Sequence, residues 1–104
     1  MKNRFDIAKN FAKHIHSDKI KQIIVFGSVA RGDDTKNSDI DILILTNDEN
    51  KIEDYIFDIT FEILIEKNEY ISPKIIHIEH YEKYKDTSFY NNVDKEGIVI
   101  GGYE

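Results

Sequence analysis

The run Ser-Asp-Ile-Asp-Ile-Leu-Ile-Leu at residues 38–45 constrains the fold of this chain more than any other segment. Its apolar residues predict a β-strand over residues 40–45. Residues i and i+2 of a strand point to one face, so the carboxylates of Asp39 and Asp41 project together, about 6.6 Å apart along the strand. Neighbouring like charges repel and Asp is disfavoured in strands, so folding does not benefit from the pair. A Mg²⁺ ion held between the two carboxylates is the natural compensation.

The spacing of apolar residues predicts the other elements. The expected strands are residues 20–26, 40–45, 71–78 and 98–100, with Pro73 placing the third of them at a sheet edge. The expected helical segments are residues 3–16, a turn at 28–31, a long helix that follows the capping residues 46–48 and closes near 67–68, and residues 87 or 88 to 96, with a short segment at 79–85. This order predicts an α/β (α+β) fold, in which helices pack on one side of a single mixed sheet of about four strands.

Four aromatic residues lie close together near the C-terminus. Their spacing is typical of core positions, so we interpret them as packing residues rather than as a stripe that binds a partner. They are Tyr81, Tyr84, Phe89 and Tyr90.

Length and charge narrow the class of protein. With 104 residues and 40% hydrophobic content, the chain is long enough for one core, so we expect a single domain over residues 1–104. The formal net charge of −6 argues against nucleic acid as a partner, because phosphate contacts need clustered Lys and Arg. The absence of cysteine excludes disulfides and thiolate metal sites. No secretory signal or bilayer-spanning apolar run is evident, so we expect a cytoplasmic protein without a membrane partner.

The dipeptide Gly27-Ser28 stands where the predicted strand at residues 20–26 meets a helical turn. Glycine permits a tight turn and close approach, and the free amides at the positive end of a helical turn favour phosphate oxygens. We therefore interpret this junction as a phosphate cradle, one strand away from the aspartate pair. The G-x-x-x-x-G spacing at residues 27–32 also opens a Walker P-loop. That motif continues with Lys and Ser or Thr, whereas this chain continues with two aspartates, which excludes a P-loop.

Together, residues 27–32 (Gly-Ser-Val-Ala-Arg-Gly) and residues 37–44 (Asn-Ser-Asp-Ile-Asp-Ile-Leu-Ile) resemble the signature of minimal nucleotidyltransferases, members of the DNA polymerase β superfamily. The resemblance implies a palm-like sheet in which Gly27 and Ser28 bind the β- and γ-phosphates of a nucleoside triphosphate. It also implies that the aspartate pair is catalytic and holds two divalent metals, expected to be Mg²⁺. Arg31 stands where the family's motif carries arginine, and it is either a triphosphate contact or a structural anchor.

The resemblance further implies a reaction and a partner. An acceptor hydroxyl would attack the α-phosphorus of the triphosphate and pyrophosphate would leave, which transfers an NMP, expected to be AMP from ATP. The chain has no evident acceptor domain, so a second protein would present the acceptor. The resemblance suggests a small helical HEPN-domain protein, with this chain as the antitoxin of a toxin–antitoxin pair and a toxin tyrosine as one candidate acceptor.

One expected residue is missing from the pattern. The superfamily normally supplies a third carboxylate from a later strand, yet the predicted strand at residues 71–78 contains no acid. Glu69 and Glu79 flank that strand, and Asp58 and Glu62 lie on the long helix; Glu79 is the preferred substitute if the strand runs further. Losing a general base costs about a hundred- to ten-thousand-fold in rate. A slow enzyme and an inactive nucleotide-binding partner subunit therefore both stay open, as do a purely structural subunit and a homo-oligomer.

Overall fold

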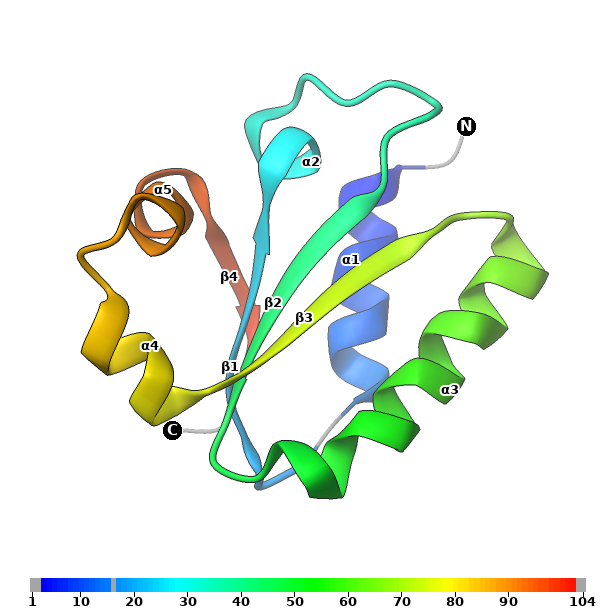
Figure 1. The fold of residues 1–104 in the computed structure, drawn as a ribbon. Coiled ribbons are helices and arrows are strands. Elements are labelled where there is room, and N and C mark those ends of the chain that lie inside the picture. The colour runs from blue at the N-terminus through cyan, green and yellow to red at the C-terminus, as the bar shows by residue number, and fades with distance from the viewer. Residues whose placement is uncertain (1–2, 16, 103–104) are drawn as a thin grey trace.

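The computed structural model describes residues 3–15 and 17–102, and this part of the chain forms five helices and four strands (Figure 1). The helices are α1 (Arg4–His14), α2 (Gly27–Arg31), α3 (Glu49–Lys67), α4 (Ile78–Tyr84) and α5 (Ser88–Glu96). The strands are β1 (Ile20–Phe26), β2 (Ile40–Thr46), β3 (Ile71–His77) and β4 (Ile98–Gly101). The predicted strands and the long helix are confirmed close to their expected bounds.

All four strands join one sheet in the order β3-β2-β1-β4. Strand β1 pairs antiparallel with β2 and with β4, whereas β2 and β3 are parallel. Parallel neighbours need a crossover connection, and α3 provides it along one side of the sheet (Figure 1). The predicted α+β class with a single mixed sheet is therefore confirmed.

Helices cover both faces of this sheet, so the prediction that they pack on one side is wrong. On one face, α1 and α3 close the larger core, where Phe11, Ile42 and Ile56 are fully buried. On the other face lie α4 and α5, and Val93 of α5 joins Leu43 in a smaller core. Figure 1 shows the two pairs of helices on opposite sides of the strands. The apolar runs of β1 and β2 are nearly continuous because these strands are buried on both faces.

The third strand ends one residue before its predicted limit, because a helix begins there. The ring Nδ1 of His77 accepts a hydrogen bond from the backbone N–H of Glu79 at 3.0 Å, which caps the start of α4. Helix α4 therefore begins at Ile78, and the short segment expected at 79–85 is mostly helical. A helix thus replaces the longer strand on which the expected role of Glu79 depended.

The N-terminus of α3 also differs from expectation. Asp48 occupies the N-cap position, but its side chain forms no capping hydrogen bond within the described residues. Instead, Thr46 Oγ1 accepts a hydrogen bond from the Asp48 N–H at 3.0 Å and donates one to the Lys19 carbonyl at 2.6 Å. Residue 16, at the predicted end of the first helix, lies outside the described residues. Within the described chain, no helix is both long and apolar enough to cross a membrane.

Candidate active site

The last residue of β1 and the first residues of β2 border a cavity of about 500 Å³ beside α2 and α5. Gly27, Ser28, Arg31, Asp39 and Asp41 all line this cavity. The structure thus brings together residues that the sequence singled out in two separate motifs. The remaining lining residues come from the strand ends, the loop before β2 and helix α5, and they are Phe26, Ser38, Phe89, Asn92, Val93 and Glu96.

Strand geometry directs both aspartates into the cavity. Asp39 immediately precedes β2 and Asp41 is its second residue, so both have the same parity along the chain. Leu43, the next residue of that parity, is buried in the smaller core beneath α5. The aspartates therefore occupy the open end of the sheet face that α5 covers.

Gly27 lies directly against one of these carboxylates. Its φ of +73° belongs to the left-handed region, and a Cβ at this position would stand 2.5 Å from Asp41 Oδ2. The antiparallel register explains the contact, because Phe26, the residue before the glycine, pairs with Asp41. Any larger residue would be strained in its backbone and would push the carboxylate away. Glycine here joins the turn into α2 to the aspartate pair.

The electrostatics of the cavity disfavour the charge on Asp41. Burial raises the pKa of its carboxyl group, and the negative charge of Asp39 raises it further. The positive charges of Lys74 and Arg31 act in the opposite direction and only partly offset these effects. The nearby cations therefore do not fully offset what burial and Asp39 cost the charged form of Asp41.

Two carboxylates in one partly buried cavity suit a hard divalent cation such as Mg²⁺, which prefers oxygen ligands. Such a cation would offset the burial and repulsion that raise the pKa of Asp41. Within residues 3–15 and 17–102, however, no group of three or more His, Cys, Asp or Glu side chains could hold a metal ion. The residues therefore fit a cation that Asp39 and Asp41 hold together with oxygens from a bound ligand or water.

Helix α2 begins at the cavity. Phe26 is its N-cap residue with extended backbone angles, and no side chain caps the helix in the described part of the chain. The backbone N–H groups of the first turn are thus left for other acceptors. At the other end of the helix, the carbonyl of Ser28 accepts hydrogen bonds from the N–H groups of Gly32 and Asp33, at 2.9 and 3.0 Å. These bonds fix the short turn whose first residues face the aspartates.

Arg31 anchors α2 to α5. Its Nε lies 3.2 Å from Asp33 Oδ2 and its Nη1 lies 3.0 Å from Glu96 Oε1. Hydrogen bonds to these two carboxylates raise the pKa of the guanidinium group. The structure thus shows the anchoring contact that the sequence left open as one alternative. Because the side chain also lines the cavity and is 45% exposed, a contact with a bound triphosphate stays a prediction.

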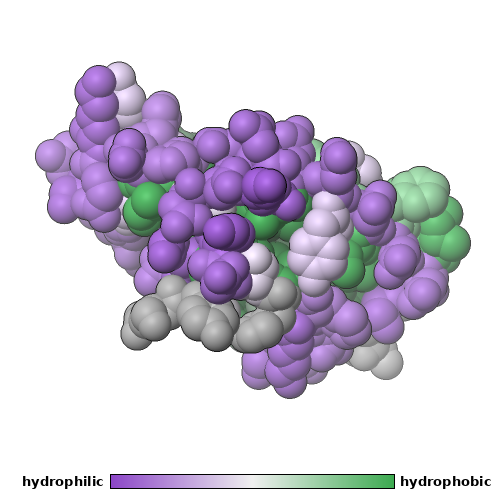
Figure 2. Space-filling model, turned by 90° about the horizontal axis from the view of Figure 1, so that it is seen from below, coloured by the Kyte–Doolittle hydropathy of each residue, from purple (hydrophilic) through white to green (hydrophobic). Residues whose placement is uncertain are grey.

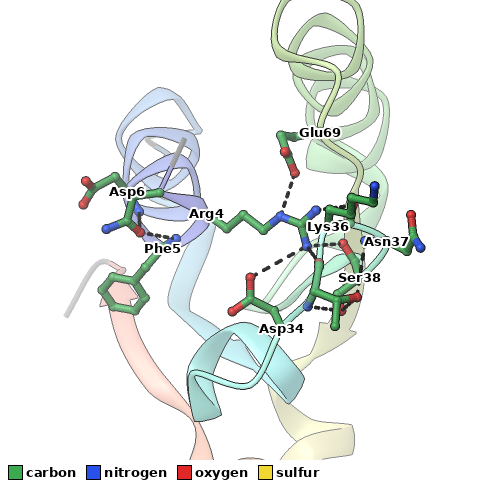
Figure 3. A network of polar contacts seen from close by, with 10 residues as sticks. Arg4, Phe5, Asp6, Asp34, Lys36, Asn37, Ser38 and Glu69 are labelled. Atoms are coloured by element: carbon green, nitrogen blue, oxygen red, sulfur yellow. Dashed lines mark hydrogen bonds and ion pairs between the residues drawn. The ribbon is translucent and has the colours of Figure 1, made fainter. Parts of the chain in front are cut away.

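A second arginine positions the loop that leads to the aspartates. Only 9% of the Arg4 side chain is exposed, and its Nε forms an ion pair with Glu69 at 3.0 Å (Figure 3). Its Nη1 donates to the Ser38 carbonyl at 2.7 Å, and the guanidinium also donates to the carbonyls of Thr35 and Lys36. The loop between α2 and β2 is therefore pinned immediately before Asp39.

None of the acids considered as a third carboxylate reaches this cavity. Residues Asp41 and Ser72 pair in the parallel register of β2 and β3, whereas His77 pairs with Thr46 at the far end. His77 is about 17 Å along β3 from Ser72, and Glu79 lies in the helix that begins beyond it, so the proposed role of Glu79 as substitute is wrong. Glu69 instead pairs with Arg4. Asp58 and Glu62 belong to α3, on the opposite face of the sheet.

Ser72 and Lys74 take the positions on β3 where such a carboxylate would lie. Ser72 pairs with Asp41, Lys74 pairs with Leu43, and Ile76 of the same parity packs in the smaller core. These three residues therefore share the sheet face of the aspartates. The neighbouring strand offers a hydroxyl and an ammonium group there, and no acid.

Several residues around the site could not be recognised as site residues from the sequence. Arg4 carried no local signal, because its partners lie about thirty or more residues away. Phe89 was interpreted as a packing residue, yet 45% of it is exposed and it lines the cavity. Asn92 and Glu96 lie on the same cavity-facing side of α5. Their amphipathic helix was visible in the sequence, but the face of the sheet that it covers was not.

Comparisons with known proteins agree with this geometry. The family model of the nucleotidyltransferase domain matches residues 6–100. Two proteins of Methanocaldococcus jannaschii, each named "putative protein adenylyltransferase", are 38% identical (88% of this chain and 88% of the relative) and 34% identical (91% and 96%). The fold is similar to a chain of a toxin–antitoxin solved with AMP-PNP, with a TM-score of 0.56 and 18% identity over 100% of this chain and 76% of that chain.

A mixed sheet that presents an aspartate pair and a Gly-Ser turn at one end, together with the family match, defines a protein of the nucleotidyltransferase class. This chain belongs to the nucleotidyltransferase domain family. The resemblance identified from residues 27–32 and 37–44 is thereby confirmed.

Proposed function

We propose that this protein transfers AMP from ATP to a hydroxyl group of a partner protein, in a reaction that depends on a divalent cation. The observation that carries the proposal is the convergence of Gly27 and Ser28 with Asp39 and Asp41 on one cavity. A volume of about 500 Å³ lies within the range of small-molecule sites. The names of the two M. jannaschii relatives support adenylyl as the transferred group and protein as the acceptor.

Each residue has a role in this proposal. The backbone N–H groups at the start of α2 and the Ser28 hydroxyl bind the terminal phosphates, and the Arg31 guanidinium faces their charge from the cavity wall. Asp39 and Asp41 would hold Mg²⁺, which would stabilise the negative charge on the phosphate oxygens and on the leaving pyrophosphate. Pinning by Arg4 keeps Asp39 in place while the acceptor hydroxyl attacks the α-phosphorus and the bond to the pyrophosphate oxygen breaks.

We further propose that the partner is a small helical HEPN-domain toxin and that this chain acts as its antitoxin. The similar solved structure is described as a toxin–antitoxin with AMP-PNP, which supports both a partner and an adenine nucleotide. Transfer of AMP adds a bulky anionic group to the acceptor. A toxin modified in this way near its functional surface would be neutralised, with a tyrosine hydroxyl as the proposed acceptor.

The decisive experiment incubates the purified chain and a purified HEPN-domain protein with ATP labelled at the α-phosphate and with Mg²⁺. We expect a label on the HEPN protein that survives denaturation, and we expect Asp39→Ala and Asp41→Ala to abolish it. Asp18→Asn is the matched control, because Asp18 is exposed and precedes β1 at the end of the sheet far from the cavity. A label that persists in both aspartate variants would contradict the assignment of the site.

One observation favours a second candidate function. The face of β3 beside Asp41 carries Ser72 and Lys74 and no acid, so this strand does not supply the third carboxylate that transfer would use. On this alternative the chain binds ATP weakly or without turnover and neutralises its partner by contact. Stabilisation of the chain against heat by Mg²⁺ and ATP, without any transferred label, supports the alternative. A Ser72→Asp variant that gains transfer activity would then identify the missing group.

A further inference from the structure

Helix α3 exposes a row of large apolar side chains on its outer surface. Phe57, Phe61 and Ile65 follow one another at intervals of four residues, and their exposed fractions are 47%, 61% and 67%. Isolated exposed apolar residues are common, but a contiguous row is not, because each member loses the stabilisation that burial would give. Figure 2, which views the molecule from below, shows apolar atoms gathered at its right-hand edge, on the side where α3 lies in Figure 1. Among residues 3–15 and 17–102, nothing covers this face of α3.

The row borders a groove. Phe57, Phe61 and Leu64 of α3 form one wall, and Tyr70 and Pro73 at the start of β3 form the other. The groove has a volume of about 340 Å³, and Tyr70 on its far wall is itself 56% exposed. A groove between a helix and an edge strand suits the apolar face of a partner helix.

Acidic side chains lie beside the apolar row. Asp54, Asp58 and Glu62 follow one another at the same four-residue interval, and Asp58 and Glu62 each come directly after a phenylalanine of the row. All three are exposed, and none forms an ion pair within the described part of the chain. Carboxylates at i and i+4 repel each other and destabilise the isolated helix. Folding therefore gains nothing from this arrangement, whereas a basic partner would be attracted by it.

Two other occupants fit the groove poorly. If two copies of this chain used the same surface to form a symmetric dimer, their acidic rows would face each other and the like charges would repel. An added β-strand is disfavoured as well. Ile40 N–H donates to the Tyr70 carbonyl, so the backbone polar groups of every second residue from Tyr70 point toward β2. Those of the residues between them, including Pro73, point to the free edge of β3. The nitrogen of Pro73 has no hydrogen to donate to an added strand there.

We propose that the groove between α3 and β3 docks a basic amphipathic helix of a partner protein. Apolar side chains of that helix fill the groove beside Phe57, Phe61 and Tyr70, and its Lys or Arg side chains pair with the acidic row. The groove belongs to the face of the sheet that α1 and α3 cover, opposite to the nucleotide cavity. A partner helix bound there leaves the cavity open, so docking and nucleotide binding are compatible.

The test uses two synthetic helical peptides with the same row of leucines at four-residue intervals. In one peptide lysines flank the leucines, and in the other glutamates take the places of the lysines. We expect fluorescence anisotropy at low salt to show binding of the lysine peptide alone, weakened by added salt. Phe61→Ser should weaken this binding about thirtyfold, the loss typical of an interface hot spot. Tyr84→Ser is the matched control, because Tyr84 is also exposed but lies on α4 across the sheet.

Charge reversal makes the test independent of folding defects. The double variant Asp54→Lys/Asp58→Lys should prefer the glutamate peptide, and such an exchange of preference cannot arise from a protein that has unfolded. Equal binding of both peptides, or no binding of the lysine peptide at concentrations up to about 1 mM, would overturn the proposal. A dimer in sedimentation experiments that Phe61→Ser dissolves would also overturn it, because the groove would then be occupied by a second copy.

Discussion

The two faces of the sheet differ: one is closed by core residues over its length, and the other borders the candidate active site at one end. On the face covered by α1 and α3, Ile42 and Ile44 are fully buried along the whole of β2. On the other face, Leu43 and Leu45 are just as buried, but Asp41, near the start of the same strand, lies beside an open cavity. A single strand thus carries apolar core residues on both faces and charged residues at one end of only one of them.

A small chain can place groups that do not help it fold at the open end of one face of its sheet. Asp39 and Asp41 repel each other and one of them is partly buried, so the pair weakens the smaller face. The larger core lies behind it and contributes most of the apolar burial. A cavity of polar residues is therefore tolerated on one face because the other face is closed.

The largest effect should come from the closed face. Ile44→Ala removes a fully buried side chain from the larger core, and we expect the free energy of unfolding to fall by about 3 to 5 kcal/mol. Leu45→Ala, the adjacent residue on the other face, should cost about 2 to 3 kcal/mol, because it removes a buried side chain from the smaller core. Urea denaturation of both variants measures the difference. Equal losses would show that the two faces support the fold equally.

Local patterns in the sequence were sufficient to predict the direction of the aspartate side chains, the turn at Gly27 and the long helix. The period of two in residues 38–45 was sufficient to place both aspartates on one face of a strand, because side-chain direction in a strand follows from parity alone. Gly27 was predicted at a turn, and its positive φ agrees. The helical stripe of α3 was equally visible, since it extends over nineteen residues. These features depend on neighbours within a few positions.

The way in which the elements surround the cavity depends on contacts between segments that are distant in the sequence. Helix α5 was predicted as an element, yet nothing in its residues indicated that Glu96 would meet Arg31 across the cavity. The positions of Ser72 and Glu79 relative to Asp41 follow from the register of β2 against β3, which the sequence of either strand alone does not specify. The prediction for Glu79 was wrong for this reason.

The second effect concerns the glycine that lies against Asp41 at the start of α2. Gly27 and Gly32 both have positive φ, but only at Gly27 would a Cβ meet Asp41, whereas nothing lies within 4 Å at Gly32. We expect Gly27→Ala to lower the free energy of unfolding by about 2 kcal/mol and Gly32→Ala by about 1 kcal/mol. Titration with Mg²⁺ and ATP, followed by thermal shift, should show weakened binding for Gly27→Ala alone. Equal binding by the two variants would separate the glycine from the site.

The third effect compares two arginines. Arg4 is nearly buried and binds carbonyls of the loop before Asp39, whereas Arg31 is half-exposed and pairs with two carboxylates. We expect Arg4→Met to cost about 1 to 2 kcal/mol, since it leaves the partly buried Ser38 carbonyl without its donor and Glu69 without its ion pair. Arg31→Met should leave the unfolding transition unchanged. Hydrogen exchange of residues 35–38 reports the local consequence, which is faster exchange in Arg4→Met and not in Arg31→Met.

The smallest effect comes from the charge on Asp41. Its pKa is raised above the ordinary 3.8, first by burial and then by Asp39, so the folded protein binds this proton more tightly than the unfolded chain does. The resulting stability is fully present below the ordinary pKa and is lost as the pH rises through the raised pKa. At pH 7 without divalent cations, we therefore expect Asp41→Asn to be more stable than the unmodified chain, by less than about 1 kcal/mol.

The advantage of Asp41→Asn should vanish near pH 3, where the carboxyl group of Asp41 is mostly protonated in the folded and the unfolded states and is then as neutral as the amide that replaces it. Mg²⁺ with ATP should reverse it at pH 7, because a cation held by both aspartates stabilises only the unmodified chain. Denaturation at the two pH values, with and without Mg²⁺ and ATP, measures all of these differences. If the variant were less stable at pH 7 in the absence of the cation, Asp41 would support the fold, and the assignment of the aspartate pair to function rather than to folding would fail.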